Sequence, residues 1–162
     1  MRAMQARVSS MATVPGAERS PGVVEHVLVP PIEGSTLAAG TITLVAGGAL
    51  DLTDGAADQL LFVYAGTGTL RADGVDHPVG DRCSLLVRAH RSATLVAGPE
   101  GIVALRATLG DETDLHAPMG ADQPVVALEH VEAGAATGAR SFQVLHGPAN
   151  GSTRATAFVG YI

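Results

Sequence analysis

The chain has 162 residues and a formal net charge of −6, and 46% of its residues are hydrophobic. This length and composition suffice for one domain with a sizeable core. The acidic balance, with no basic stripe, argues against nucleic acid as a partner. No apolar run approaches the roughly 20 residues that span a bilayer. No apolar segment follows the N-terminal arginines, so we expect neither a membrane anchor nor a secretory signal.

Cys83 is the single cysteine, which excludes a disulfide within one chain and any zinc site built from cysteines. A chain without disulfides fits a cytoplasmic location, which we therefore expect. We expect Cys83 itself to be a small buried residue on a strand, because free cysteine is usually buried.

The first segments read as an arm followed by two strands. Residues 1–22 are small and polar and end in Ser20-Pro21-Gly22, which predicts a flexible N-terminal arm. Val23–Val29 is predicted to be a strand that ends at two prolines, because proline cannot donate to a ladder. Ser35–Val45 follows, and its last five residues alternate with the period of two expected of a half-buried strand.

Residues 47–96 consist of short apolar segments separated by glycine and aspartate. Short strands at near-regular spacing indicate a β-sandwich or barrel. Gln59–Ala65 is apolar on both faces, so we place it near the centre of a two-layered structure. The other strands predicted here and just beyond are Thr69–Ala72, Cys83–Val87, Ser92–Ala97 and Ile102–Leu109, with turns at Gly66-Thr67-Gly68, Asp73-Gly74, Gly80-Asp81 and Gly98–Gly101.

The glycines of this stretch resemble those of the cupin family. The first cupin motif is G-x5-H-x-H-x3/4-E-x6-G, and the second is G-x5-P-x-G-x2-H-x3-N. Gly47 and Gly66 match the two ends of the first motif, Gln59 stands at its glutamate position, and Gly80 opens the second. The resemblance covers most of the chain from Val24 onward. It implies an all-β fold, a cupin-like jelly-roll β-barrel followed by a strand-containing C-terminal tail.

The resemblance does not extend to the residues that bind metal in cupins. The two histidine positions of the first motif hold Thr53 and Gly55, or Leu52 and Asp54 with the longer spacer. A divalent ion needs several imidazole and carboxylate donors to replace its bound water. A neutral Gln59 is a weak ligand, so we expect no metal and no other cofactor in this barrel.

In the second motif, strict spacing puts Arg91 at the histidine position, and His90 is its neighbour. With Arg88 they form a small cationic cluster. One interpretation is an anion-binding rim for a carboxylate substrate, because arginine presents a bidentate fork; the other is a solvated turn. If a ligand pocket exists, we expect Thr53, Gly55 and Gln59 to line it, with His90 or Arg91 at the rim and Tyr64 or Phe62 as an apolar wall.

Two other metal sites have less support. Three aspartates at positions 51, 54 and 58 offer oxygen ligands for calcium, but their spacing is not that of an EF-hand, so a solvated acidic loop is favoured. The histidines share no ligand spacing such as H-x-H; they are His26, His77, His90, His116, His130 and His146.

The tail, residues 111–162, reads as a linker followed by strands. Val125–Val131 fits either a short strand or one helical turn, and Ser141–Leu145 fits a strand followed by a loop from His146 to Gly151. Thr153–Ile162 is a predicted final strand that resembles the opening strand of the second unit in two-barrel cupins, or bicupins. The predicted division is therefore an arm (1–22), a cupin-like barrel (23–110), and the beginning of a second cupin domain (111–162), cut short.

Two classes of function follow from these residues. The first is a non-catalytic barrel with a degenerate metal site, structural or binding a small molecule, and forming a homodimer because an unpaired apolar final strand is an aggregation hazard. The alternative is the N-terminal part of a metal-dependent bicupin enzyme, resembling ureidoglycine aminohydrolases or cupin dioxygenases, whose catalytic barrel lies outside these residues. The sequence leaves open whether the chain is an enzyme.

Overall fold

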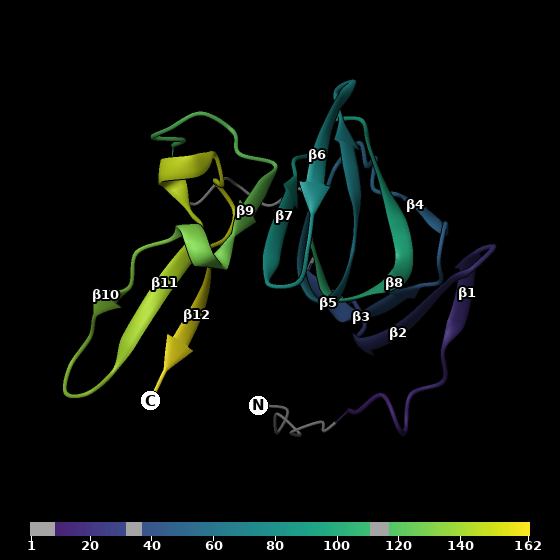
Figure 1. The fold of residues 1–162 in the computed structure, drawn as a ribbon, viewed down its shortest axis with the longest axis horizontal. Helices are drawn as coiled ribbons and strands as arrows, with labels where there is room; N and C mark the ends of the chain where they lie inside the picture. The colour runs from purple at the N-terminus through teal and green to yellow at the C-terminus, as the bar shows by residue number, and fades with distance from the viewer. Residues whose placement is uncertain (1–8, 32–36, 111–116) are drawn as a thin grey trace, which may run out of the picture.

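The structure, a computed structural model, describes residues 9–31, 37–110 and 117–162. The strands of the described chain all pair antiparallel, and they form a nine-stranded sheet and a separate three-stranded sheet (Figure 1). The strands are β1 (Ala17–Ser20), β2 (Val23–Val29), β3 (Leu37–Leu44), β4 (Ala49–Asp51), β5 (Asp58–Ala72), β6 (Val75–Val79), β7 (Cys83–Val87), β8 (Ala93–Leu109), β9 (Val125–Ala127), β10 (Gly134–Ala135), β11 (Ser141–His146) and β12 (Ala157–Tyr161). Two short 3₁₀ turns, Leu128–His130 and Pro148–Asn150, interrupt the tail.

The barrel is organised around two long strands, β5 and β8, which pair with each other along nearly their whole length. The first half of β5 also pairs with β7 and its second half with β6. In the same way β8 pairs first with β4 and then with β3. Because each long strand bends and changes neighbours, the sheet folds back on itself. The prediction of an all-β, jelly-roll barrel is confirmed.

Two predicted turns are wrong. Gly66-Thr67-Gly68 lies inside β5 and Gly98–Gly101 inside β8, so each pair of predicted strands is one continuous strand. The pairing shifts register between Gly66 and Gly68, which marks a β-bulge. Gly66 has φ of 99°, and a Cβ there would lie 2.0 Å from the Gly101 carbonyl oxygen. Glycine is therefore required at position 66 to let β5 bend against β8, not to reverse the chain.

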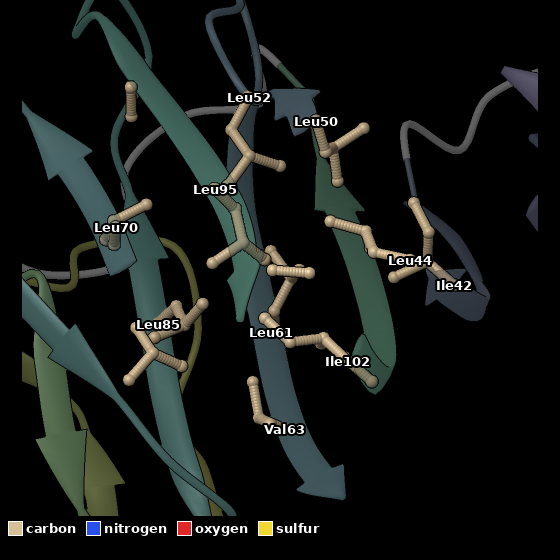
Figure 2. Close-up of a cluster of buried hydrophobic side chains, with 14 of the residues drawn as sticks. Ile42, Leu44, Leu50, Leu52, Leu61, Val63, Leu70, Leu85, Leu95 and Ile102 are labelled. Atoms are coloured by element: carbon tan, nitrogen blue, oxygen red, sulfur yellow. The ribbon is translucent and has the colours of Figure 1, made fainter. Parts of the chain in front are cut away.

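The barrel interior is filled by aliphatic side chains from opposite walls (Figure 2). Leu52, Leu61 and Leu95 have essentially no exposed surface. They meet Ile42, Leu44, Leu50, Leu70, Leu85 and Ile102 in one cluster. With no tryptophan and few aromatic residues, the core is built from leucine, isoleucine, valine and alanine, and these residues leave the middle of the barrel packed rather than hollow.

The N-terminal segment is more ordered than the expected flexible arm. Ala17–Ser20 forms β1, which pairs with β2 and so extends the barrel sheet. Residues 1–8 of that predicted arm lie outside the described residues. β2 has the bounds expected for the first strand, Val23–Val29.

The tail divides between the barrel and a sheet of its own. Val125–Ala127 is β9, which pairs with β7, so this part of the predicted second domain extends the barrel sheet. The segment expected to be a strand or a helical turn is both, because a 3₁₀ turn follows β9 directly. β10, β11 and β12 form the three-stranded sheet, which stands beside the barrel in Figure 1.

A buried polar contact attaches the tail to the barrel. His146, predicted to begin a loop, instead ends β11 and has 0% of its surface exposed. Its Nδ1 lies 2.8 Å from the Ser84 hydroxyl oxygen on β7, and its Nε2 lies 2.9 Å from the Gln123 carbonyl oxygen. Burial lowers the pKa of His146 below its ordinary value, which favours the neutral ring at this junction.

No helix in the described part of the chain combines the length and the apolar composition that crossing a bilayer would require.

Candidate functional site

The structure distinguishes between the two spacings of the first glycine motif. Leu52 is buried in the barrel core, and the Asp54 carboxylate lies 3.4 Å from the side-chain nitrogen of Gln59. Thr53 and Gly55 are exposed. Of the four candidate positions, only Leu52 is therefore buried in the barrel core, and Asp54 is half-buried.

Thr53 makes hydrogen bonds to neighbouring strands and does not line a cavity. Its backbone N–H donates to the Asp51 carboxylate at 2.8 Å, and its hydroxyl oxygen accepts from the Ala93 N–H at 3.2 Å. These bonds hold the end of β4 against the start of β8. The expectation that Thr53 and Gly55 line an internal cavity is not met by their positions.

Asp54 is held as a carboxylate by the backbone around it. Hydrogen bonds from the N–H groups of Ala56 and Ala57 lower its pKa below the ordinary value, and the charge of Arg106 acts in the same direction. Asp54 therefore caps a tight turn. Asp58, which was expected to belong to a solvated acidic loop, is instead buried. It is 1% exposed and accepts a hydrogen bond from the Ala89 N–H at 2.8 Å.

Gln59 takes part in a polar cluster at one end of the barrel interior. Its side-chain oxygen accepts hydrogen bonds from Arg106 Nε at 3.0 Å and from the Thr108 hydroxyl at 3.2 Å. Arg106 Nη1 lies 3.0 Å from the Glu25 carboxylate, and Arg19 contacts the other oxygen of that carboxylate. We call these five residues the mouth cluster: Arg19, Glu25, Gln59, Arg106 and Thr108.

The mouth cluster borders an open cavity of about 290 Å³. Its lining consists of Arg19, Ser20, Leu50, Asp51 and Arg106. The Arg19 side chain is 53% exposed and that of Arg106 is 17% exposed, so one guanidinium faces solvent and the other lies deeper. Both arginines pair with Glu25, and Asp51 also lines the cavity, so arginine and carboxylate charges balance around it.

Sequence reasoning missed four members of the mouth cluster. A signal was available, because Glu25 is the one acidic residue in Val23–Val29 and Arg106 is the one charged residue in Ile102–Leu109. The register places both on the inward face: Glu25 pairs with Ile42, and Arg106 with Leu61. A charged residue at an inward position of an apolar strand indicates a paired group or a site.

His90 and Arg91 lie away from the mouth cavity. His90 is exposed, has φ of 66°, and donates its backbone N–H to the Asp54 carbonyl at 2.8 Å. Arg91 lies 3.3 Å from the Asp73 carboxylate and 3.6 Å from that of Asp122. The predicted anion-binding rim is thus already neutralised by two aspartates of the same chain.

Arg88, the third member of that cationic cluster, holds the tail. It donates to the Gly151 carbonyl at 2.9 Å and to the Thr153 hydroxyl at 3.0 Å, and it lies 3.7 Å from Asp122. On the same side, Arg154 donates to the carbonyl oxygens of Ala56 and Gly110. The segment around Arg88, for which a solvated turn was the alternative prediction, therefore forms part of a junction between the barrel and the tail.

The two aromatic residues expected to wall an internal pocket lie on the outer face of β5. Tyr64 is 57% exposed. Phe62 lines a different cavity, an apolar groove of about 610 Å³ between the outer face of the barrel sheet and the tail sheet. Neither side chain lines the barrel interior, since the inward positions alternate with theirs and are occupied by Leu61 and Val63.

Among residues 9–31, 37–110 and 117–162, no three histidine, cysteine, aspartate or glutamate side chains gather closely enough to hold a metal ion. His116 lies outside these ranges.

Solved structures with the same barrel identify the fold. A cupin from Shewanella frigidimarina, described as RmlC-like, is similar over 64% of this chain and 90% of its own, with a TM-score of 0.56 and 18% identity. KdgF from a Halomonas species is similar over 64% of this chain and 94% of its own, with a TM-score of 0.55 and 14% identity. The chain has the cupin fold.

A third solved structure is similar to a larger share of this cupin-fold chain. A protein from Pseudomonas aeruginosa, described as glyoxylate-induced, is similar over 89% of this chain but only 61% of its own, with a TM-score of 0.67 and 13% identity. The likeness therefore extends beyond the barrel into the tail. No family model matches the sequence, and no curated protein matches it either.

Proposed function

We propose that this cupin-fold chain is a non-catalytic barrel that binds a small organic anion at its mouth. The observation that carries the proposal is the mouth cluster, in which Arg106 stands between Gln59 and Glu25. A guanidinium occupies the place beside the glutamate-position residue, and its fixed positive charge disfavours a divalent cation there. The same charge favours a carboxylate or another small anion.

The packing of the barrel supports the same proposal. Leu52 stands at a histidine position of the first motif and packs in the same core cluster as Leu95. Aliphatic side chains have no lone pairs to offer a metal, so the donor set in this region is reduced to Asp54 and Gln59. We place the protein in the cytoplasm, which agrees with a single, buried cysteine.

The test combines elemental analysis with ligand titration. The purified chain is expected to contain no stoichiometric manganese, iron, nickel or zinc, and to bind sodium succinate in calorimetry at low ionic strength. Arg19→Gln should weaken succinate binding at least tenfold, because Arg19 faces the cavity and is exposed enough for the fold to tolerate the change. Arg71→Gln is the matched control, since Arg71 pairs with Asp76 outside the cavity.

Stoichiometric bound metal would overturn the proposal, and so would succinate binding that Arg19→Gln leaves unchanged. Metal-free protein that does not bind succinate would also overturn the proposal and would favour a structural role for the barrel.

A second candidate is that these residues are the N-terminal part of a two-barrel protein whose metal site lies elsewhere. The observation that favours it is the likeness to the Pseudomonas aeruginosa structure, which runs through the tail and leaves a large share of that protein unmatched. Mass spectrometry of the protein from its native cells tests this candidate. A native polypeptide whose mass shows that it ends at Ile162 would refute this candidate.

A further inference from the structure

The three-stranded tail sheet has one substantial open edge. Within the described residues β12 pairs with β11 alone, and β11 pairs on its other side with β10, which is only two residues long. In Figure 1, β12 lies on the barrel side of this sheet and β10 on the far side. The backbone groups along the open edge of β12 are a template for another strand.

The edge of β12 lacks the features that usually protect such strands. Ala157–Tyr161 reads AFVGY, with no lysine, no other charged residue and no proline. Its large side chains are left in solvent: Phe158 is 63% exposed and Tyr161 is 43% exposed. Water satisfies the backbone groups of such an edge but not the apolar side chains beside it.

The space next to this edge is the apolar groove of about 610 Å³. One wall is β12 itself, through Ala157, Phe158 and Val159. The other wall is the outer face of the barrel sheet, with Leu28, Leu60, Phe62, Leu105 and Ala107. Leu105 is 50% exposed although it lies within β8, paired with Thr41 on one side and Phe62 on the other. The groove therefore offers an added strand both backbone partners and an apolar floor.

The chain is complementary to itself at this groove. An antiparallel pair of β12 strands centred on Val159 places Phe158 of one copy opposite Gly160 of the other, and Ala157 opposite Tyr161. Each large side chain then meets a small one. A Cβ added at Gly160 would find no atom nearer than the Phe158 ring, at 3.8 Å, so there is room above this glycine.

Charge also permits this pairing. Each copy carries a formal net charge of −6. Among the described residues that line the groove, the one charged side chain is Arg106, whose guanidinium is paired with Glu25 inside the barrel. No carboxylate would therefore be forced against a like charge when two copies meet here.

We propose that two copies of this chain form a dimer by antiparallel pairing of their β12 strands, so that the two tail sheets become one six-stranded sheet. Each tail then covers the outer sheet face of the other copy's barrel. The occupant of the groove is the partner's β12, and the interface is isologous, with its two-fold axis at Val159. This assembly is independent of what the mouth cluster binds.

The first test is the mass of the full chain in solution by light scattering after size exclusion. The expected mass is twice that of one chain at micromolar concentration. Phe158→Glu should give a single-chain mass, because the dimer would bury two carboxylates beside an apolar floor. Val75→Glu is the matched control: Val75 is 57% exposed, lies on β6 and is not part of the groove.

Leu105→Glu changes the opposite wall of the groove and should also give a single-chain mass. This second variant decides the matter if circular dichroism shows that Phe158→Glu is unfolded. A single-chain mass for the unmodified protein, or a dimer that persists in both variants, would overturn the proposal.

Cross-linking tests the register directly. Directly opposed residues of antiparallel strands have Cα atoms about 4.5–5.5 Å apart, within the range of a disulfide. Val159→Cys should therefore give a disulfide-linked dimer on mild oxidation, whereas Val75→Cys should not. The native Cys83 is buried and contributes little background. A dimer in which Val159→Cys does not cross-link would refute the β12 register.

Discussion

The ion pair at the barrel mouth predicts a specific pattern of stability changes. Glu25 is buried and Arg106 is largely buried, with 8% and 17% of their side-chain surface exposed, and their charged atoms lie 3.0 Å apart. Removing one partner of such a pair typically costs about 3–5 kcal/mol, because the other charge is left without compensation. Arg106→Met does this to Glu25 and also removes one of the donors to Gln59.

We expect the cost of Arg106→Met to fall at the lower end of that range. Arg19 still contacts Glu25 after the change, and Thr108 still donates to Gln59. Arg19 compensates only weakly, since it is more than half exposed and exposed pairs contribute little. The expected loss in the free energy of unfolding is therefore about 3 kcal/mol.

The double variant Glu25→Gln/Arg106→Met separates the buried charge from simple packing. Once Glu25 is neutral, no unpaired charge remains, so the double variant should lose less than Arg106→Met alone. The assay is urea denaturation followed by circular dichroism, with the m-value checked for constancy. A loss below about 1 kcal/mol in the single variant, or a double variant less stable than the single, would refute this account of the mouth cluster.

Three further results are expected, all from urea denaturation. Leu95→Ala should cost about 2–5 kcal/mol, because a fully buried leucine leaves a cavity in the packed interior; a loss below that range would mean the barrel collapses around it. Gly66→Ala should cost much more than Gly74→Ala, because both residues have positive φ but only at Gly66 would the new Cβ strike another atom, the Gly101 oxygen. Equal losses would contradict the bulge. The unfolded chain binds a proton at His146 more readily than the folded one, since burial lowers the folded pKa below 6.5. Stability from this group is thus present above about pH 6.5 and falls as the pH drops below it, and His146→Gln should remove that slope; a slope that persists unchanged would assign it to other groups.

The cupin fold could be predicted from the sequence because its signals are local. Apolar segments such as Cys83–Val87 have the bounds of real strands, and the glycines at positions 47, 66 and 80 have the cupin spacing. The poor donor set at the histidine positions can also be read directly from residue types. These features depend on short stretches of chain, in which steric preference and hydrophobic periodicity act alone.

The site could be predicted only in part. Gln59, one of the predicted ligand-binding residues, lies in the mouth cluster, whereas Tyr64 lies on the outer face of β5 and Arg91 pairs with Asp73. The cluster's partners come from β1, β2 and β8, which are far apart in sequence. A local pattern cannot tell which face of a strand is inward when both faces carry apolar residues, as in β5.

The sequence by itself thus determined most of the barrel strands, the glycine positions and the residue types at the histidine positions, because these follow from the chemistry of neighbouring residues. The tertiary structure decided three other features. It made β5 and β8 continuous through glycines that read as turns, since a bulge and a turn both need a backbone with positive φ. It brought Arg106 between Glu25 and Gln59, and it set the open edge of β12 beside an apolar face of the barrel. Each depends on which strands become neighbours, and pairing across the sheet is a property of the whole fold rather than of any one segment.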